Sequence, residues 1–287
     1  MLSSIFFLPV GVISFLKLFN LNTFEKLMKT LTIIIPVYNE ENRVHSAFKA
    51  IKSFKNTRGI SVRKFVFVND GSKDSTLDML KDFKKLYSKN IPTGASIQIV
   101  TYKKNRGRGY AIKQGLKKVS TDYALYVDSD LSIPFYNLKN FTAYLDQGYD
   151  LLIGSKKKPG AIAVPQRSIL RQIVGYGHTV FGTLILGTFA WDFQGGFKIF
   201  SNRFINEVVI PRANQERWGL DMETVFLAKK LKYNFIEIPV VWGSVDEGST
   251  VKVGRDIKRA LNDMIEIRTN WFKNTWVLRN LSLGKIA

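Results

Sequence analysis

Two aspartates separated by one residue, Asp128 and Asp130, are the strongest candidates for chemistry in this sequence. They follow an apolar run from Tyr123 to Val127, which is typical of a buried strand. In open parallel sheets ligands bind at the carboxyl ends of the strands, so both carboxylates would lie at a ligand edge. Their hard oxygen atoms suit Mg²⁺ or Mn²⁺, which would in turn hold a diphosphate. The alternative is a solvated turn that caps the next helix, and this motif alone does not separate the two.

Three further polar segments follow apolar runs that are typical of strands. They are residues 38–41, 69–72 and 105–109. Strand-like runs alternate with helical stretches through this half of the chain, which predicts βαβ units and an α/β fold with a mainly parallel sheet. Right-handed crossovers place every strand-to-helix loop on one edge of such a sheet. We therefore expect these three loops and residues 128–132 to converge on one crevice.

The loops after the first two strands carry groups that fit a nucleoside. Pro36, Tyr38 and Glu40 can form one wall, in which Tyr38 stacks on a base and Glu40 accepts a hydrogen bond from a ribose hydroxyl. Asp70 can accept hydrogen bonds from a nucleobase imide or a ribose hydroxyl. The alternatives are ordinary core packing for Tyr38 and a helix N-cap for Asp70.

The loop at residues 105–109 has the composition of a phosphate site. Its glycines let the backbone approach a phosphate closely, and Arg106 and Arg108 add positive charge. The glycine spacing matches neither the dinucleotide-binding fingerprint nor the P-loop. A turn with two solvated arginines is the alternative.

The composition restricts what the chain binds. Its 43 Lys and Arg against 23 Asp and Glu give a net charge of +20, which favours nucleic acid, nucleotide phosphates or anionic lipid. The absence of cysteine excludes disulfides, thiolate zinc sites and a cysteine nucleophile, and two histidines are too few for a multi-histidine metal site. The 287 residues suffice for one domain with a C-terminal elaboration, although a boundary near Gly154 is possible.

Three segments have the character of membrane-surface elements. Within residues 1–28, the stretch 5–19 is mostly apolar but falls short of the ~20 apolar residues that a spanning helix needs. We interpret residues 1–28 as a surface segment or weak anchor, with a packing or disordered extension as the alternative. Residues 165–190 and 255–287 combine apolar faces with basic residues, which is typical of interfacial helices, although these stripes could instead pack on the sheet.

Taken in order, these motifs resemble those of the family 2 glycosyltransferases, which have the GT-A fold. The segments that carry this resemblance are residues 36–41, 69–76, 105–109 and 128–130. Later segments are similar to those of dolichyl-phosphate β-glucosyltransferases and other polyprenyl-phosphate hexosyltransferases: residues 154–156, 166–168, 192–198 and 216–218, with Asp221 and Glu223. Several motifs in matching order are a far stronger signal than any one of them.

The resemblance implies a metal-dependent enzyme that moves glucose from UDP-glucose to a dolichyl or undecaprenyl phosphate, with inversion to a β-linked lipid-phosphate sugar. Mannosyl or other hexosyl transfer is the alternative. It also implies a membrane-associated protein whose catalytic domain lies on the cytoplasmic face. We divide the chain into an apolar membrane-associating segment (1–28), a GT-A catalytic domain (29–254) and amphipathic membrane-surface helices (255–287). A basic nucleic-acid-binding module and a non-catalytic membrane scaffold are the non-enzyme alternatives; the enzyme hypothesis expects no nucleic acid partner.

The resemblance also assigns roles to individual residues. The nucleotide-binding residues are Pro36, Tyr38, Glu40, Asp70, Arg108 and Asp128. The metal ligands are Asp128 and Asp130, with Mg²⁺ or Mn²⁺ as the ion. The catalytic residues are Asp130, Gln194 and Arg217, with Trp218 beside Arg217. The residues that receive the acceptor phosphate are Lys156, Arg167 and Arg171.

Three positions depart from the family pattern. Asn69 replaces an acidic residue, which puts the base contacts in doubt. Lys156 stands where close relatives carry Arg, so bidentate phosphate binding is lost. Ser132 stands where mannosyl-transferring relatives carry a metal-binding Gln, so the resemblance assigns no third metal ligand. No catalytic histidine is expected, because a phosphate monoester with a second pKa of about 6 is already mostly ionised at neutral pH.

Overall fold

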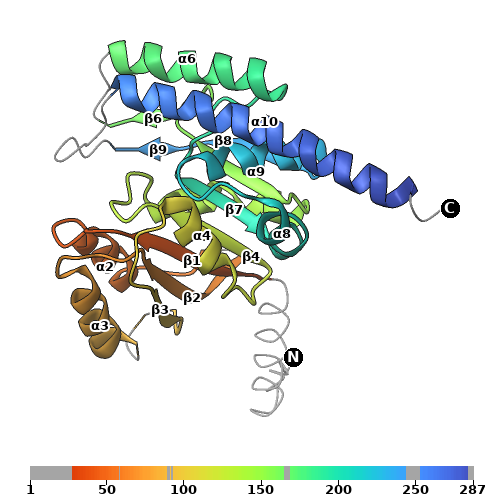
Figure 1. The fold of residues 1–287 in the computed structure, drawn as a ribbon. Coiled ribbons are helices and arrows are strands. Elements are labelled where there is room, and N and C mark those ends of the chain that lie inside the picture. Colours follow the sequence, from red (N-terminus) through yellow and green to blue (C-terminus); the bar gives the residue numbers. More distant parts are fainter. Residues whose placement is uncertain are drawn as a thin grey trace, which may run out of the picture.

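A seven-stranded sheet in the order β3-β2-β1-β4-β7-β5-β8 forms the centre of the molecule (Figure 1). The computed structural model describes residues 28–57, 59–88, 91, 93–164, 169–243 and 253–283. The strands of this sheet are β1 (Lys29–Val37), β2 (Ile60–Asn69), β3 (Ser96–Thr101), β4 (Tyr123–Val127), β5 (Leu151–Ser155), β7 (Phe197–Ser201) and β8 (Phe235–Pro239). Strand β7 runs antiparallel to both of its neighbours, and all other pairs are parallel. The predicted α/β fold with a mainly parallel sheet is confirmed.

Both faces of the sheet are covered, which explains the unbroken apolar runs of its strands. In β1, Ile33 and Ile35 belong to one core and Ile34 to the other, and all three are fully buried. Because side chains alternate between faces along a strand, a strand that is buried on both faces has apolar residues at successive positions. The first core packs under α2 (Val44–Lys52) and α3 (Thr76–Tyr87), and the second under α4 (Arg108–Leu116) and α9 (Gly219–Lys230).

Helix α4 lies unusually close to the sheet, and this places its first residue at the strand ends. A Cβ on Gly115 would lie 2.4 Å from Cγ2 of Ile34, so any other residue there would push the helix outward. The remaining short helices are η1 (Phe135–Asn140), α5 (Thr142–Asp146), α7 (Asn202–Phe204), η2 (Ile205–Val209) and α8 (Ile210–Arg212). The segment after β4 is thus divided into a 3₁₀-helix and a short α-helix.

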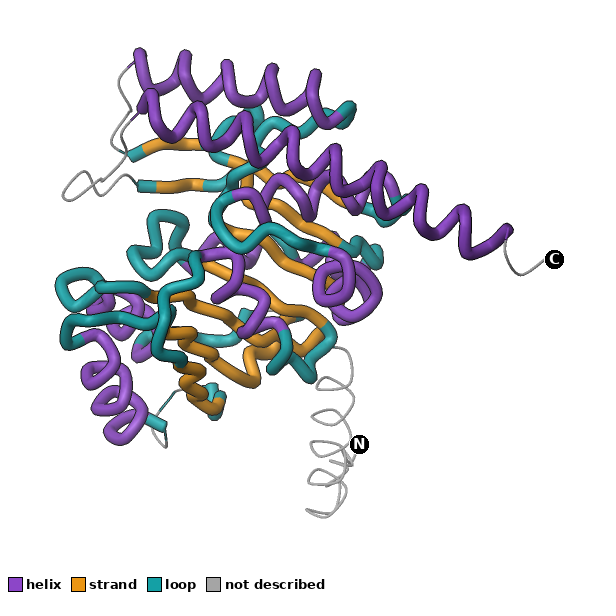
Figure 2. Tube along the Cα trace, in the orientation of Figure 1, coloured by secondary structure: helices purple, strands orange, loops and turns teal. Residues whose placement is uncertain are grey.

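The second half of the chain adds two long helices that lie side by side, α6 (Ile169–Leu186) and α10 (Val253–Leu283) (Figures 1 and 2). Beneath them, β6 (Ile162–Ala163) and β9 (Val241–Trp242) form a small parallel pair. The stretch from Phe235 to Trp242 therefore forms two strands, β8 and β9. Pro239 ends the first because it has no N–H to donate to the sheet.

Helix α10 both packs on the second hydrophobic core and exposes apolar residues. Ala260, Met264 and Ile267 are buried in the molecule, whereas Ile265 and Phe272 are more than half exposed. Among the residues that the structure describes, no helix combines the length and hydrophobicity needed to cross a bilayer. The predicted apolar segment at residues 1–28 lies outside the described residues, apart from its last one.

Candidate active site

Asp70 ties the loop after β2 to the loop after β3. Its carboxylate accepts hydrogen bonds from Asn105 Nδ2 and from the backbone N–H groups of Arg106 and Gly107, each at 2.8 Å. The loop after β1 is fastened to the same place, because the backbone N–H of Glu40 donates to Thr76 Oγ1 at 2.8 Å. These bonds bring together three of the four loops that were predicted to converge. Asp70 is 3% exposed and three of its acceptor positions are filled, so it acts first as the clamp of this loop.

Gly107 is the position where the 105–109 loop needs glycine. Its φ of +107° lies in a region that side chains disfavour, and a Cβ there would lie 2.8 Å from the carbonyl oxygen of Glu216. The same carbonyl accepts the backbone N–H of Tyr110 at 2.8 Å, and the Glu216 carboxylate pairs with Arg106. The 216–218 segment therefore packs against the 105–109 loop.

Glu40 brings a third carboxylate to this edge. Its Oε1 accepts from Arg43 at 2.8 Å, while Oε2 is buried without a well-formed hydrogen bond to any described residue. Burial raises the pKa of Glu40, Arg43 and Ser129 oppose that rise, and the nearby carboxylate of Asp130 adds a smaller increase. The loops after β1 and β4 therefore face each other.

The two aspartates after β4 have different surroundings. Asp130 Oδ1 accepts the backbone N–H of Ser132 at 2.9 Å, across Leu131, whose φ is +51°. Asp128 Oδ1 accepts from Arg108 Nε at 2.9 Å, and its Oδ2 faces Gly196, where a Cβ would lie 2.1 Å away. Both carboxylates are partly exposed to the same edge.

This donor set fits a divalent cation. No cluster of three or more His, Cys, Asp or Glu side chains arranged to hold a metal occurs within the described part of the chain. Asp128 and Asp130 would therefore supply two oxygens, and water and substrate phosphates the rest. Mg²⁺ is bound in this way in many phosphate-handling enzymes. The buried, unsatisfied Glu40 Oε2 adds negative potential beside them.

Arg108 joins Asp128 to a second, buried carboxylate. Its Nη1 lies 2.5 Å from Asp221 Oδ2, and its guanidinium stacks over Tyr126 and Trp218 at 5.1 and 4.9 Å from their ring centroids. Lys198, with a fully buried side chain, donates to the other oxygen of Asp221 at 2.9 Å. Burial raises the pKa of Asp221 and lowers that of Lys198, because desolvation opposes both charges.

The family model described as "Glycosyl transferase family 2" matches residues 32–209, which hold all four converging loops. The chain belongs to glycosyl transferase family 2. It is 30% identical to dolichyl-phosphate β-glucosyltransferase of Saccharomyces cerevisiae, over 83% of this chain and 74% of the yeast protein. It is 28% identical to the protein of that name from Dictyostelium discoideum, over 87% of this chain and 77% of the relative.

Solved structures of the GT-A type share the fold of this family 2 chain. Glucosyl-3-phosphoglycerate synthase of Mycobacterium tuberculosis in complex with UDP superposes with a TM-score of 0.60 at 15% identity, covering 83% of this chain and 80% of that one. Its complex with Mn²⁺, UDP and glucosyl-3-phosphoglycerate gives 0.55 at 16% identity, with the same coverage. At this identity the likeness concerns the fold.

The predicted nucleotide wall of this glycosyltransferase lies at the carboxyl end of β1. Pro36 is half-buried there, and Tyr38 is 41% exposed, so Tyr38 is not the core side chain of the alternative interpretation. Gln194 is half-buried in the turn before β7. Arg217 is exposed and packs its Cγ against Gly107, where a Cβ would lie 2.8 Å away.

The predicted acceptor residues are only partly described. Lys156 Nζ donates to Ser132 Oγ at 3.1 Å and lies 5.2 Å from the centroid of Trp242, which places it beside the Asp130 loop. Arg171 lies in α6, but its side chain is outside the described residues, as is the whole of Arg167. Helix α6 is nevertheless fastened to this region, because Lys157 Nζ donates to Gly175 O at 2.8 Å.

Two charged residues of the site had no role in the sequence prediction. They are Lys198 and Asp221, which are buried beneath Arg108. Lys198 stands among phenylalanines and isoleucine within β7, and a charge inside an otherwise apolar strand requires a buried partner. The lysine in an apolar strand therefore indicates a buried charge pair in the sequence, but it does not identify Asp221 as the partner.

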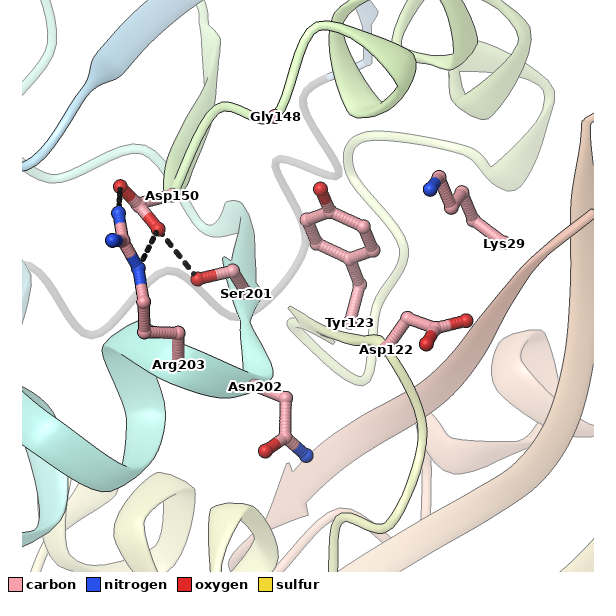
Figure 3. Close-up of a pocket in the computed structure, with 8 residues that line it drawn as sticks. All are labelled: Lys29, Asp122, Tyr123, Gly148, Asp150, Ser201, Asn202 and Arg203. Atoms are coloured by element: carbon pink, nitrogen blue, oxygen red, sulfur yellow. Dashed lines mark hydrogen bonds and ion pairs between the residues drawn. The ribbon is translucent and has the colours of Figure 1, made fainter.

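The cavity in Figure 3 lies at the opposite edge of the sheet, where β4 and β5 begin and β7 ends. It measures about 480 Å³ and is lined by Lys29, Asp122, Tyr123, Gly148, Asp150, Ser201, Asn202 and Arg203. Its buried Asp150 already accepts from Arg203 Nη2 at 2.6 Å and from Ser201 Oγ at 2.9 Å. None of the predicted site residues lines it, so we do not assign the transferase site to this cavity.

Proposed function

We propose that this chain transfers glucose from UDP-glucose to a polyprenyl phosphate such as dolichyl phosphate, and that the product is β-linked. The observation that carries the proposal is the meeting of Glu40, Asp70, Asp128 and Asp130 at the carboxyl edge of the sheet. Relatives named dolichyl-phosphate β-glucosyltransferase, aligned over most of their length, support the choice of sugar and lipid.

The donor nucleotide would lie over the ends of β1 and β2. The exposed ring of Tyr38 offers a stacking surface, and Pro36 and Glu40 complete the wall. Asp70 Oδ1 accepts the Arg106 N–H, and the Tyr102 hydroxyl also interacts with this carboxylate. In this proposal Asp70 meets the base while it holds the 105–109 loop in place.

The donor diphosphate would lie over the aspartate loop. Asp128 and Asp130 would hold Mg²⁺ or Mn²⁺, which when bound neutralises the diphosphate and the departing UDP. Lys156, held beside the Asp130 loop by Ser132, would draw the acceptor phosphate towards the sugar. Gln194, Arg217 and Arg171 border the same region in the proposal.

The reaction needs little proton transfer from the protein. The phosphate monoester is already mostly ionised at neutral pH, since its second pKa is about 6. Its oxygen attacks the anomeric carbon of glucose as the bond from that carbon to the UDP oxygen breaks, and UDP leaves as an anion. One displacement inverts the α-linkage of the donor to a β-linkage. The work of the site is to orient two anions and to stabilise the leaving diphosphate.

The acceptor's lipid tail requires that the enzyme work at a membrane surface, and α6 has an exposed apolar face on which to do so. Tyr176, Val180, Phe181 and Leu184, spaced along one side of the helix, are 47 to 72% exposed. With Ile265 and Phe272 of α10 they form the face that we propose meets the bilayer from the cytoplasmic side. The division of the chain into a membrane-associating segment (1–28), a catalytic domain (29–254) and membrane-surface helices (255–287) is part of the same proposal.

The function is tested with a donor panel. Purified protein is given Mn²⁺ or Mg²⁺, dolichyl phosphate in detergent, and UDP-glucose, GDP-mannose or UDP-N-acetylglucosamine, and lipid-linked sugar is measured. We expect transfer from UDP-glucose above the others, with a β-linkage by NMR. Asp82→Asn, which changes an exposed acid of α3, is the matched control for carboxylate variants of the site. An α-linked product, or preferred transfer from GDP-mannose, would contradict the proposal.

A further inference from the structure

Arg108 occupies the position of a counter-ion for Asp128. Two of its nitrogens face the same oxygen: Nε lies 2.9 Å and Nη2 2.7 Å from Asp128 Oδ1. On its other side Nη1 meets Asp221 Oδ2 at 2.5 Å. The side chain is only 11% exposed, so this pairing is poorly screened by water.

The two ends of Arg108 are held unequally. Asp221 is 1% exposed, and Lys198 and the Tyr126 hydroxyl hold its Oδ1, so among the described residues Oδ2 is left to Arg108. Asp128 is 32% exposed and faces the crevice, so the outer bond is open to exchange. Arg108 can therefore release Asp128 and remain anchored through Asp221.

Arg108 Nη2 has unused hydrogen-bonding capacity at this place. It is buried and lies 2.7 Å from Asp128, yet it forms no well-directed hydrogen bond with any residue that the structure describes. A guanidinium N–H in that state binds an anionic oxygen more strongly than it binds a badly aligned carboxylate. A diphosphate at the mouth of the site would supply such an oxygen.

We propose that Arg108 is the resident counter-ion of Asp128 in the free enzyme, and that a divalent cation binds Asp128 only by displacing it. The proposal rests on the proposed function to the extent that Asp128 serves the metal of a nucleotide-sugar donor. A cation of charge +2 and a guanidinium compete for one carboxylate, since each lowers the affinity of Asp128 for the other. The metal alone therefore binds weakly, and the diphosphate favours it by offering Arg108 a new partner. Metal and nucleotide then bind with positive coupling, which must be reciprocal.

The test is a Mn²⁺ titration of the purified full-length protein without nucleotide, with free Mn²⁺ followed by electron paramagnetic resonance. We expect Arg108→Gln to bind Mn²⁺ at least about fivefold tighter than the wild type, a coupling at the low end of the usual range. Arg203→Gln is the matched control, because it removes the same charge from an Asp–Arg pair at the far edge of the sheet. It should leave the affinity for Mn²⁺ unchanged, whereas Asp128→Asn should abolish the gain when combined with Arg108→Gln.

A second titration, with UDP present, measures the coupling. UDP should tighten Mn²⁺ binding to the wild type, and that gain should be smaller in Arg108→Gln. Equal or weaker Mn²⁺ binding by Arg108→Gln in the first titration overturns the proposal, as does a failure of this variant to bind Mn²⁺ at all. Tighter Mn²⁺ binding by Arg108→Gln with no effect of UDP on either protein supports the counter-ion role and instead contradicts the proposed donor.

Circular dichroism of each variant establishes that it is folded. Should Arg108→Gln not fold, Arg108→Lys replaces it, because a single ammonium cannot bond both Asp128 and Asp221 in the two-sided way of the guanidinium. Arg108→Lys should tighten Mn²⁺ binding about threefold, less than the range expected for full removal of the competitor. An affinity equal to that of the wild type overturns the proposal.

Discussion

Two Asp–Arg pairs lie at opposite edges of the same sheet, and their burial is reversed. At the carboxyl edge the arginine is inside: Arg108 is 11% exposed and Asp128 32%. At the other edge the aspartate is inside: Asp150 is 3% exposed and Arg203 59%. Asp150 also accepts from Ser201 Oγ at 2.9 Å (Figure 3). One pair therefore presents a carboxylate to the crevice, and the other buries it among donors.

This difference distinguishes a ligand site from a structural one where residue types do not. A carboxylate whose acceptor positions are filled from within the chain stabilises the fold and has little left for a ligand. A carboxylate held on one side only, with a charged group behind it, can exchange partners. The predictions below change each edge in turn, beginning with the largest expected effect.

Asp130→Asn should lower kcat/KM for sugar transfer by about 100- to 1000-fold, the usual cost of removing one group that stabilises developing charge. The side-chain oxygen of Asn can keep the hydrogen bond from the Ser132 N–H, so the loop should retain its shape. The measurement is transfer of labelled glucose to polyprenyl phosphate, with thermal unfolding as the check on folding. Activity within a factor of three of the wild type would remove Asp130 from the proposed site.

Replacing one glycine at each edge by alanine should have different effects on activity, and both effects should be smaller than that of Asp130→Asn. A Cβ on Gly196 would lie 2.1 Å from Asp128 Oδ2, so Gly196→Ala must move that carboxylate. A displacement of about 1 Å at a reacting centre can cost up to ~100-fold in rate, and we expect a loss of about that size.

Gly148 is the comparison at the other edge. A Cβ there would meet nothing within 4 Å, but its φ of +76° is unfavourable for alanine. Gly148→Ala should therefore cost about 1–2 kcal/mol of folding free energy and leave transfer by the folded protein unchanged. Equal loss of activity in both variants would mean that the two edges are not functionally distinct.

The loops at the carboxyl edge can be predicted from the sequence because each is located by the residues immediately around it. Apolar runs locate β1 and β4, and the rule for crossovers brings their following loops together without knowledge of any contact. The pairing of Arg108 with Asp221 joins residues 113 positions apart, and no periodicity specifies such a pair. For the same reason the sequence does not show that Asp128 already has a partner.

The antiparallel strand and the opposite edge are harder to predict. Strand β7 is mostly apolar apart from Lys198, like the neighbours β4 and β5 to which it runs antiparallel, so composition does not reveal its direction. Asp150 and Arg203 look like ordinary surface charges in the sequence, and only the register of β7 beside β5 places them together. Contacts that depend on tertiary packing cannot be predicted from the residue pattern of a single helix or strand.

Asp150→Ala should destabilise the protein without changing its chemistry. It removes the acceptor of the Arg203 guanidinium and of the Ser201 hydroxyl, and a buried donor left unsatisfied costs about 1–3 kcal/mol. Urea unfolding measures the change, and kcat of the folded fraction should match the wild type. Arg203→Gln should cost less than about 1 kcal/mol, since that side chain is 59% exposed. A loss of kcat in Asp150→Ala would link this edge to the reaction.

The last prediction is a pH dependence that arises near the carboxyl edge. Both ring nitrogens of His178, on α6, are buried without a hydrogen-bond partner among the described residues. Burial, with a smaller contribution from Lys157, lowers the pKa of His178 from 6.5 to about 4, and Asp192 opposes this shift. The unfolded chain therefore takes up a proton below pH 6.5 that the folded chain takes up only near pH 4, so stability falls as the pH drops between these values.

Between pH 7 and pH 5 this residue should cost the wild type about 1–2 kcal/mol of unfolding free energy, allowing for partial exposure to water. His178→Phe removes the titrating group but keeps an apolar ring, so its stability should fall less over the same interval. The second histidine of the chain, His45, is exposed on α2, and His45→Gln should follow the wild-type curve. Parallel curves for the wild type and His178→Phe would mean that His178 is protonated as readily in the folded protein as in the unfolded chain.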